Sequence, residues 1–184
     1  GLDDALLGQC LQPVAVLDAL RATRRAARAV AVDVLDVNPR VIAALAALAG
    51  TTPVLRLQSS LSARTHRLLP AYREYLQQWG AALGLASSPL VERVDGRLRR
   101  EVSLPAGTWP SGRSHHANVA LDVVKGSYDL IVATNVLAYL PEPALAASLV
   151  AVAAALRPGG VLLHNDARDL VALVGPEAGL PIVQ

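Results

Sequence analysis

The sequence predicts an α/β protein in which a doubly wound, mostly parallel sheet forms one domain of 184 residues. Two observations support this class. Branched apolar runs without alternation, such as Ala29 to Leu35 and Tyr128 to Thr134, are typical of parallel strands that are buried on both faces. Segments with helical spacing stand between such runs, and alternation of strand and helix favours a parallel sheet.

The first part of the chain is expected to supply two helices and two strands. Residues 13–27 have the spacing of a helix with an apolar face and an arginine-rich face, and the strand 29–35 follows. Asn38 is a favourable N-cap for the second helix, and Pro39 suits its first position. A second strand is expected over residues 52–57.

Residues 58–114 interrupt the alternation and are predicted to be an insertion that covers the ligand cleft and selects the substrate. A helix is expected over residues 72–83. Residues 90–104 resemble a hairpin that turns on the dipeptide Asp95-Gly96. The hairpin is basic, which favours an anionic substrate, although arginines are also common on a solvated surface. Its arginines are Arg93, Arg97, Arg99 and Arg100.

The alternation resumes after the insertion. Strands are expected over residues 118–124, 128–134 and 161–164, with an alanine-rich helix over residues 143–156. The four residues 157–160, Arg-Pro-Gly-Gly, are expected to form the turn between this helix and the last strand.

Two aspartates stand at the end of the first buried strand. Ligands of an open parallel sheet bind beyond the carboxyl ends of its strands, where a carboxylate can accept both hydroxyls of a ribose. Asp36 lies at the junction of strand and helix cap, and Asp33 lies within the strand or at its end. These residues alone explain ribose binding and stabilisation of a helix start equally well.

Two later stretches carry a resemblance to a known family. YDLIVATNVLAYL from Tyr128 and LRPGGVLLHND from Leu156 resemble the fourth and fifth strands of class I S-adenosylmethionine-dependent methyltransferases, which have a Rossmann-like fold. The closest branch contains the chemotaxis-receptor glutamate methyltransferases, where an Asn-Val-Leu-x-Tyr run follows the fourth strand. NVALD at Asn118 resembles a segment of the same branch, and LDVNPRVI at Leu35 resembles the ribose-binding strand end of the family.

The resemblance implies methyl transfer with S-adenosyl-L-methionine as cofactor. It implies that Asp36 binds the ribose, and that Tyr139 lies near the methyl group as the single catalytic residue. Gly8 stands at the position of the family's glycine-rich turn. The residues implied around the adenine and methionine ends are Asn118, Val119, Thr134 and Asn135. The methyl acceptor, a small molecule or a protein carboxylate, is set by loops outside the shared sheet.

Two other functions remain open. A non-catalytic, Rossmann-like module that binds a nucleoside or a protein partner would fit the single glycine at Gly8. A nicotinamide-dependent oxidoreductase would need a G-x-G-x-x-G pattern after the first strand, and the sequence lacks that pattern there.

The amino-acid composition narrows the possible locations and partners of the protein further. The single cysteine, Cys10, forms no disulfide framework and is typical of a reducing, cytoplasmic compartment. A net charge of +2 is too small to predict a nucleic-acid partner. No apolar run reaches the roughly 18 residues of a membrane span, so no membrane partner is expected. His115 and His116 have no second ligand pair at metal spacing, so no metal site is expected, and nothing indicates an oligomeric state.

Overall fold

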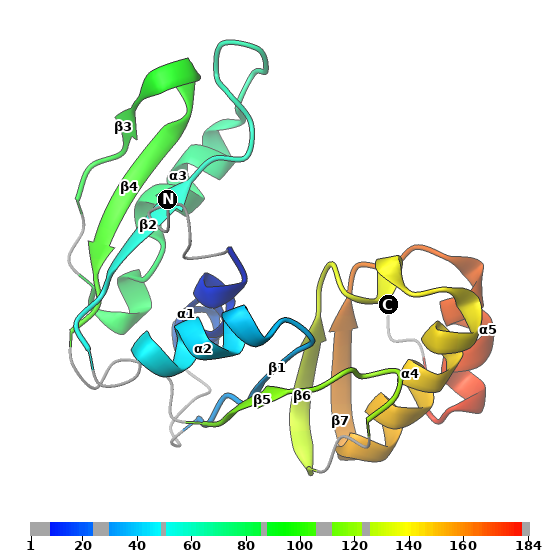
Figure 1. Cartoon of the computed structure of the whole chain (residues 1–184). Helices are drawn as coiled ribbons and strands as arrows, with labels where there is room; N and C mark the ends of the chain where they lie inside the picture. The colour runs from blue at the N-terminus through cyan, green and yellow to red at the C-terminus, as the bar shows by residue number, and fades with distance from the viewer. Residues whose placement is uncertain are drawn as a thin grey trace. The chain divides into compact units, whose positions relative to one another are not determined.

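The computed structural model describes residues 8–23, 30–48, 51–85, 88–105, 112–122 and 126–181. The chain divides into two compact units, Gly1–His116 and Ala117–Gln184, and each is described by itself. Both combine helices with small sheets, which confirms the α/β class (Figure 1). The sheets are two parallel pairs and one antiparallel sheet of three strands, so the doubly wound arrangement stays a prediction.

The first unit contains one of the parallel pairs. Strand β1 (Val34–Asp36) pairs in parallel with β5 (Ser114–His116), and Asp36 lies opposite His116. Helix α2 (Pro39–Leu48) follows β1 as predicted. Asn38 caps this helix, because its side-chain Oδ1 accepts the backbone N–H of Arg40 at 3.0 Å.

The elements before α2 are shifted from their expected bounds. Helix α1 (Gly8–Ala22) begins five residues earlier than the expected 13–27, with Pro13 inside it. The strand expected over 29–35 is regular only at Val34–Asp36, while residues 24–29 lie outside the described residues.

The second strand of the chain pairs differently from the expectation. Strand β2 (Val54–Gln58) lies antiparallel to β4 (Leu98–Ser103), which in turn pairs with β3 (Val91–Glu92). The expected membership of β2 in a parallel sheet is therefore wrong. Its side chains alternate between exposed and buried, with Leu55 and Leu57 inside, as in a sheet that packs on one face only.

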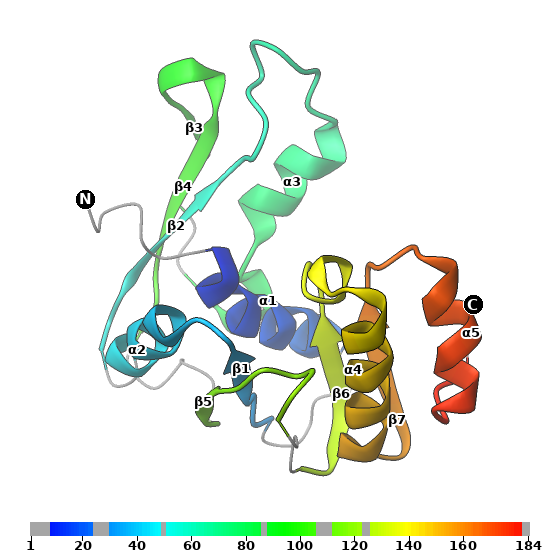
Figure 2. The ribbon, with the colours of Figure 1, turned by 45° about the vertical axis from the view of Figure 1, so that its right-hand side comes forward.

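The antiparallel sheet forms the centre of the first unit's core. Helix α3 (Pro70–Gln78) lies along one face of the sheet, and the expected helix over 72–83 is thus present with different ends (Figure 2). The core joins residues of α1, the sheet and the end of α3, namely Val14, Leu55, Leu57, Leu76, Trp79, Leu85, Leu98, Val102 and Leu104. The segment 58–114 is therefore not separable from this core, and the description of the chain as one domain with an insertion stays a prediction.

The hairpin of β3 and β4 reverses at Asp95-Gly96, as predicted. Both residues have positive φ angles, 61° for Asp95 and 70° for Gly96. The loop has three residues rather than two, because the N–H of Arg93 bonds to the carbonyl of Arg97 at 3.0 Å. A Cβ on Gly96 would lie 2.6 Å from Cγ of Arg64, so glycine is needed for both its conformation and its packing.

The second unit holds the other parallel pair. Strand β6 (Tyr128–Ala133) and strand β7 (Leu156–His164) are joined by helix α4 (Glu142–Ala155), and helix α5 (Asp169–Glu177) follows β7. The strand, helix, strand order predicted for this region is confirmed. The core of the unit is apolar and includes Ala133, Leu137, Leu145, Leu149 and Val171.

Two local predictions in this unit need correction. The strand expected over residues 118–124 is absent from its described part, because Asn118 starts a helical turn in which its Oδ1 accepts the N–H of Ala120 at 3.0 Å. The turn expected over residues 157–160 is absorbed into β7 as an irregularity. There the register jumps from Tyr128 opposite Leu156 to Leu130 opposite Val161.

Candidate functional site

Asp36 lies at the carboxyl end of β1, where the helix α2 is about to begin. Its Oδ1 accepts the backbone N–H of Asn38 at 2.7 Å, which fixes the carboxylate at the start of the helix. Its Oδ2 has no hydrogen-bond partner among the residues that the structure describes. Asp36 therefore stabilises the turn and still offers an oxygen to a ligand, so the two explanations of this acid are compatible.

Asp33 has a different environment. Its Oδ1 accepts the backbone N–H of Arg113 at 2.8 Å, and its Oδ2 lies 3.7 Å from the guanidinium of the same residue. The N–H of Val34 bonds to the carbonyl of Arg113 at 2.8 Å. Asp33 thus joins β1 to the residue before β5, which makes it a structural acid.

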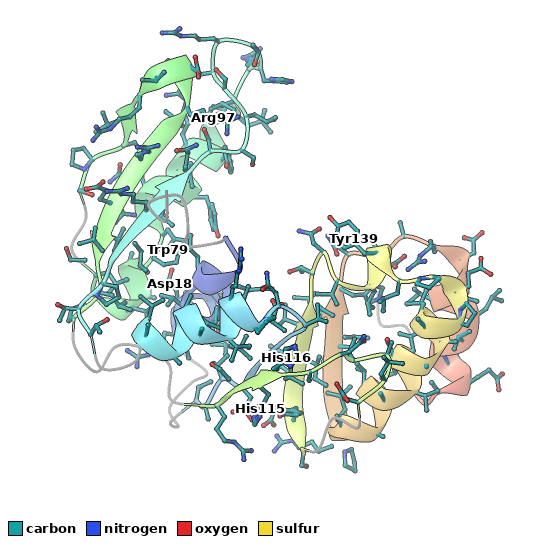
Figure 3. All side chains as sticks on the ribbon, viewed as in Figure 1. Asp18, Trp79, Arg97, His115, His116 and Tyr139 are labelled. Atoms are coloured by element: carbon teal, nitrogen blue, oxygen red, sulfur yellow. The ribbon has the colours of Figure 1, made fainter. Side chains whose placement is uncertain are left out.

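His115 and His116 lie in β5, the strand that pairs with β1. His116 lies opposite Asp36, and its Nε2 is 2.9 Å from the carbonyl oxygen of Val37 (Figure 3). No group of three or more metal-ligating side chains exists within the described ranges. Gly8 is the first residue of α1, and residues 1–7, where the preceding loop would lie, are outside the described residues.

The carboxyl end of β6 carries Thr134 and Asn135, as the sequence predicted. Asn135 is exposed and has a φ angle of 55°. Its amide is paired with Asn165 after β7: the N–H of Asn135 donates to Oδ1 of Asn165 at 2.8 Å, and Nδ2 of Asn165 donates to Oδ1 of Asn135 at 2.7 Å. Both the backbone N–H and the side-chain oxygen of Asn135 are thus bonded to Asn165.

Asn118 and Val119 lie in the turn that replaces the expected strand. The backbone N–H of Asn118 donates to Oδ2 of Asp122 at 2.7 Å, and the Asn118 side-chain oxygen is used within the same turn. Both residues are half-buried. Their expected role beside a nucleoside stays a prediction.

Tyr139 ends a short 3-10 helix, Leu137–Tyr139, in the loop after β6. Leu137 is buried and anchors this turn in the core, while Tyr139 is 80% exposed (Figure 3). The ring of Tyr139 is therefore exposed in the loop that follows the carboxyl end of β6.

Asp166 and Arg168 form an ion pair after β7 that the sequence did not predict. The carboxylate of Asp166 is 1% exposed and bonds to the guanidinium of Arg168, with 2.5 Å between Oδ2 and Nη2. These hydrogen bonds lower the pKa of Asp166 from its ordinary 3.8 to about 2, and the same hydrogen bonds raise the pKa of Arg168. The only signal in the sequence was the run of polar residues directly after a buried strand.

Fewer arginines of the hairpin are exposed than the sequence indicated. Arg100 is buried, and its Nη1 donates to the carbonyls of Leu76 and Trp79, both at 2.9 Å. It thereby satisfies the end of α3, and burial lowers its pKa. Arg99 bonds to the side chain of Gln58 on β2. The exposed arginines of the hairpin are Arg93 and Arg97, and the latter is labelled in Figure 3.

No model of a protein family matches the chain, and no curated protein matches it. Among the described helices, none is both long enough and apolar enough to cross a membrane.

Proposed function

We propose that this protein is an S-adenosylmethionine-dependent methyltransferase of the class I, Rossmann-like type, with its doubly wound sheet. The supporting observation is the position of Asp36 at the carboxyl end of a parallel strand. One oxygen of this carboxylate holds the start of α2, and the other has no partner among the described residues. Such a carboxylate can accept ribose hydroxyls through charge-assisted hydrogen bonds.

The second unit supports the proposal with the loop after β6. This loop places Asn135 and the exposed ring of Tyr139 directly after a parallel strand, where ligands of such sheets bind. The reciprocal bonds between Asn135 and Asn165 hold the loop in one conformation. A loop that is fixed before binding loses less conformational entropy when a ligand arrives.

The chemistry needs little from the side chains beyond positioning. When bound, S-adenosylmethionine supplies an electrophilic methyl group on a sulfonium. The task of the chain is then to hold donor and acceptor in line, and positioning of this kind supplies much of the catalysis. In this proposal Asp36 is the residue that binds the ribose, Tyr139 is the catalytic residue, and the acceptor is a small molecule or a protein carboxylate. The single cysteine supports a reducing, cytoplasmic location.

A non-catalytic nucleoside-binding or protein-binding module is the second candidate. The observation in its favour is the single glycine, Gly8, at the start of α1, where a cofactor loop would need several. Isothermal titration calorimetry of the full chain with S-adenosylhomocysteine and with NAD separates the methyltransferase from a nicotinamide-dependent oxidoreductase and from a protein-binding module. We expect heat of binding with S-adenosylhomocysteine only. Binding of NAD alone would indicate an oxidoreductase, and binding of neither would leave the protein-interaction module.

A further inference from the structure

The side chain of Arg168 joins the loops after β6 and β7, in addition to the pair Asn135 and Asn165. The Nη1 of Arg168 donates to the carbonyl of Leu140 at 2.7 Å, and its Nη2 donates to the carbonyl of Leu137 at 2.5 Å. Its Nε and Nη2 also bond to the carboxylate of Asp166. We call Asp166 and Arg168 the clasp.

The two carbonyls that the clasp holds lie on either side of Tyr139. The N–H of Leu140 bonds to the carbonyl of Leu137 at 3.0 Å, so the turn itself is closed. The last carbonyls of a helical turn lack partners within it, and Arg168 donates to one of these, that of Leu140, as well as to the carbonyl of Leu137, which is already bonded inside the turn. The backbone around Tyr139 is therefore fixed from outside the turn, while its ring stays 80% exposed.

The guanidinium is suited to this task and an ammonium group is not. A guanidinium is planar, with donors that point in several fixed directions, whereas a lysine ends in a point charge. The carboxylate of Asp166 keeps the fork in place: its Oδ1 also accepts the backbone N–H of Arg168 at 2.9 Å. Arg168 is 34% exposed and Asp166 1%, so the anchor of the clasp lies inside and its fork reaches toward the surface.

We infer that Arg168, held by Asp166, is a positioning residue that fixes the loop of Tyr139 at the carboxyl end of β6. The identity of the ligand that contacts Tyr139 rests on the proposed function. The hydrogen bonds from Arg168 to the loop do not depend on that function. Arg168 touches neither the reacting atoms nor the cofactor in this assignment, and it acts through Tyr139.

The first test is amide hydrogen exchange in the variant Arg168→Lys, which keeps a positive charge beside Asp166 and loses the fork. We expect the amides of Tyr139 and Leu140 to exchange about tenfold faster, since hydrogen bonds from a charged donor carry roughly this factor. The control is Arg157→Lys in the same unit, whose arginine pairs with Asp129 on the surface and should leave the loop unchanged.

Amides inside α4, such as that of the buried Leu149, provide the reference. If loop and α4 amides accelerate together, Arg168 is a general brace of the unit and the inference is overturned. If the loop amides exchange within twofold of the parent protein, the clasp does not hold the loop and the inference is also overturned. Faster exchange confined to the loop supports it.

The second test follows the ring of Tyr139 by NMR of tyrosine labelled with carbon-13, with Tyr139→Phe to assign the signal. Saturating S-adenosylhomocysteine should shift this signal in the parent protein. In Arg168→Lys the shift should fall by half or more, while Kd from calorimetry stays within about threefold; an undiminished shift would count against positioning. A signal that never shifts in the parent would contradict the role of Tyr139 in the proposed function, and hydrogen exchange would still decide on the clasp.

Discussion

The carboxylate of Asp18 in α1 accepts the backbone N–H of Gly80 at 2.8 Å, across 62 residues of sequence. Its other oxygen accepts the N–H of Ala82 at 2.9 Å. Gly80 follows α3 with a φ angle of 82°, so this acid holds the turn that ends the helix (Figure 3). The first helix of the chain is thus bonded to the segment that the sequence presented as an insertion.

Asp18→Ala should lower the free energy of unfolding by about 1–3 kcal/mol, because two hydrogen bonds to a carboxylate are lost. Urea unfolding of the full chain, followed by tryptophan fluorescence to which the buried Trp79 contributes, measures this change. Glu92→Ala is the control, since Glu92 is exposed on a short edge strand and should change stability by less than about 0.5 kcal/mol. Equal midpoints for the two variants would contradict the assignment.

Gly96→Ala should destabilise the first unit more than Gly84→Ala. Both glycines have φ angles near 70°, so both variants incur the cost of a left-handed residue, about 1 kcal/mol. Only at Gly96 would the new methyl group meet neighbours, with Cγ of Arg64 at 2.6 Å. The difference between the two unfolding free energies therefore measures packing at the hairpin end, and a difference of zero would show that the loop 62–66 simply moves aside.

The stability of the second unit should fall in acid because of Asp166. Its folded pKa is about 2, below the ordinary 3.8, so the ionised form is favoured in the folded protein. The resulting stabilisation is complete above the unfolded pKa and is lost as pH falls from about 4 toward 2. Urea midpoints at pH 5, 4 and 3 should decline more steeply in the parent than in Asp166→Asn. Parallel curves would show that other groups cause the decline.

Asp36→Asn should weaken binding of S-adenosylhomocysteine by about ten- to a hundredfold, the range for a hydrogen bond to a charged group. Asparagine keeps the side-chain oxygen that accepts the N–H of Asn38, so the start of α2 should be preserved. Calorimetry measures the affinity, and circular dichroism checks the fold. An unchanged Kd would remove Asp36 from the proposed site.

The structural features that could be predicted from the sequence are those that depend on adjacent residues. The cap Asn38-Pro39 and the turn Asp95-Gly96 depend on neighbouring side chains and backbone angles, and both occur where predicted. The partner of β2 depends on residues 45 positions away, as the bond between Arg56 and Glu101 shows. Alternation within β2 indicated one exposed face, but it could not name the strand that pairs with it.

The same distinction between local and distant contacts applies to the residues of the candidate site. The positions of Asp36 and Asn135 at strand ends follow from short apolar runs, which the sequence displays directly. Asn165 and Arg168 act across about 30 residues on the loop after β6, and polar residues after a strand otherwise indicate only a turn. Burial likewise separates Arg100 from its neighbours, although all four hairpin arginines look alike in the sequence.

The order of strands in the antiparallel sheet determines when the core of the first unit can form during synthesis on the ribosome. β2 leaves the exit tunnel long before β4, its only partner in the described sheet, and until then Leu55 and Leu57 can be covered only by the core residues that precede β4, such as Val14 and Leu76. The first unit can therefore complete its core only after Leu104 has emerged, whereas the second unit draws its core from later residues alone. A nascent chain stalled before β4 would carry an unpaired apolar strand, which is a substrate for chaperones and a start point for aggregation.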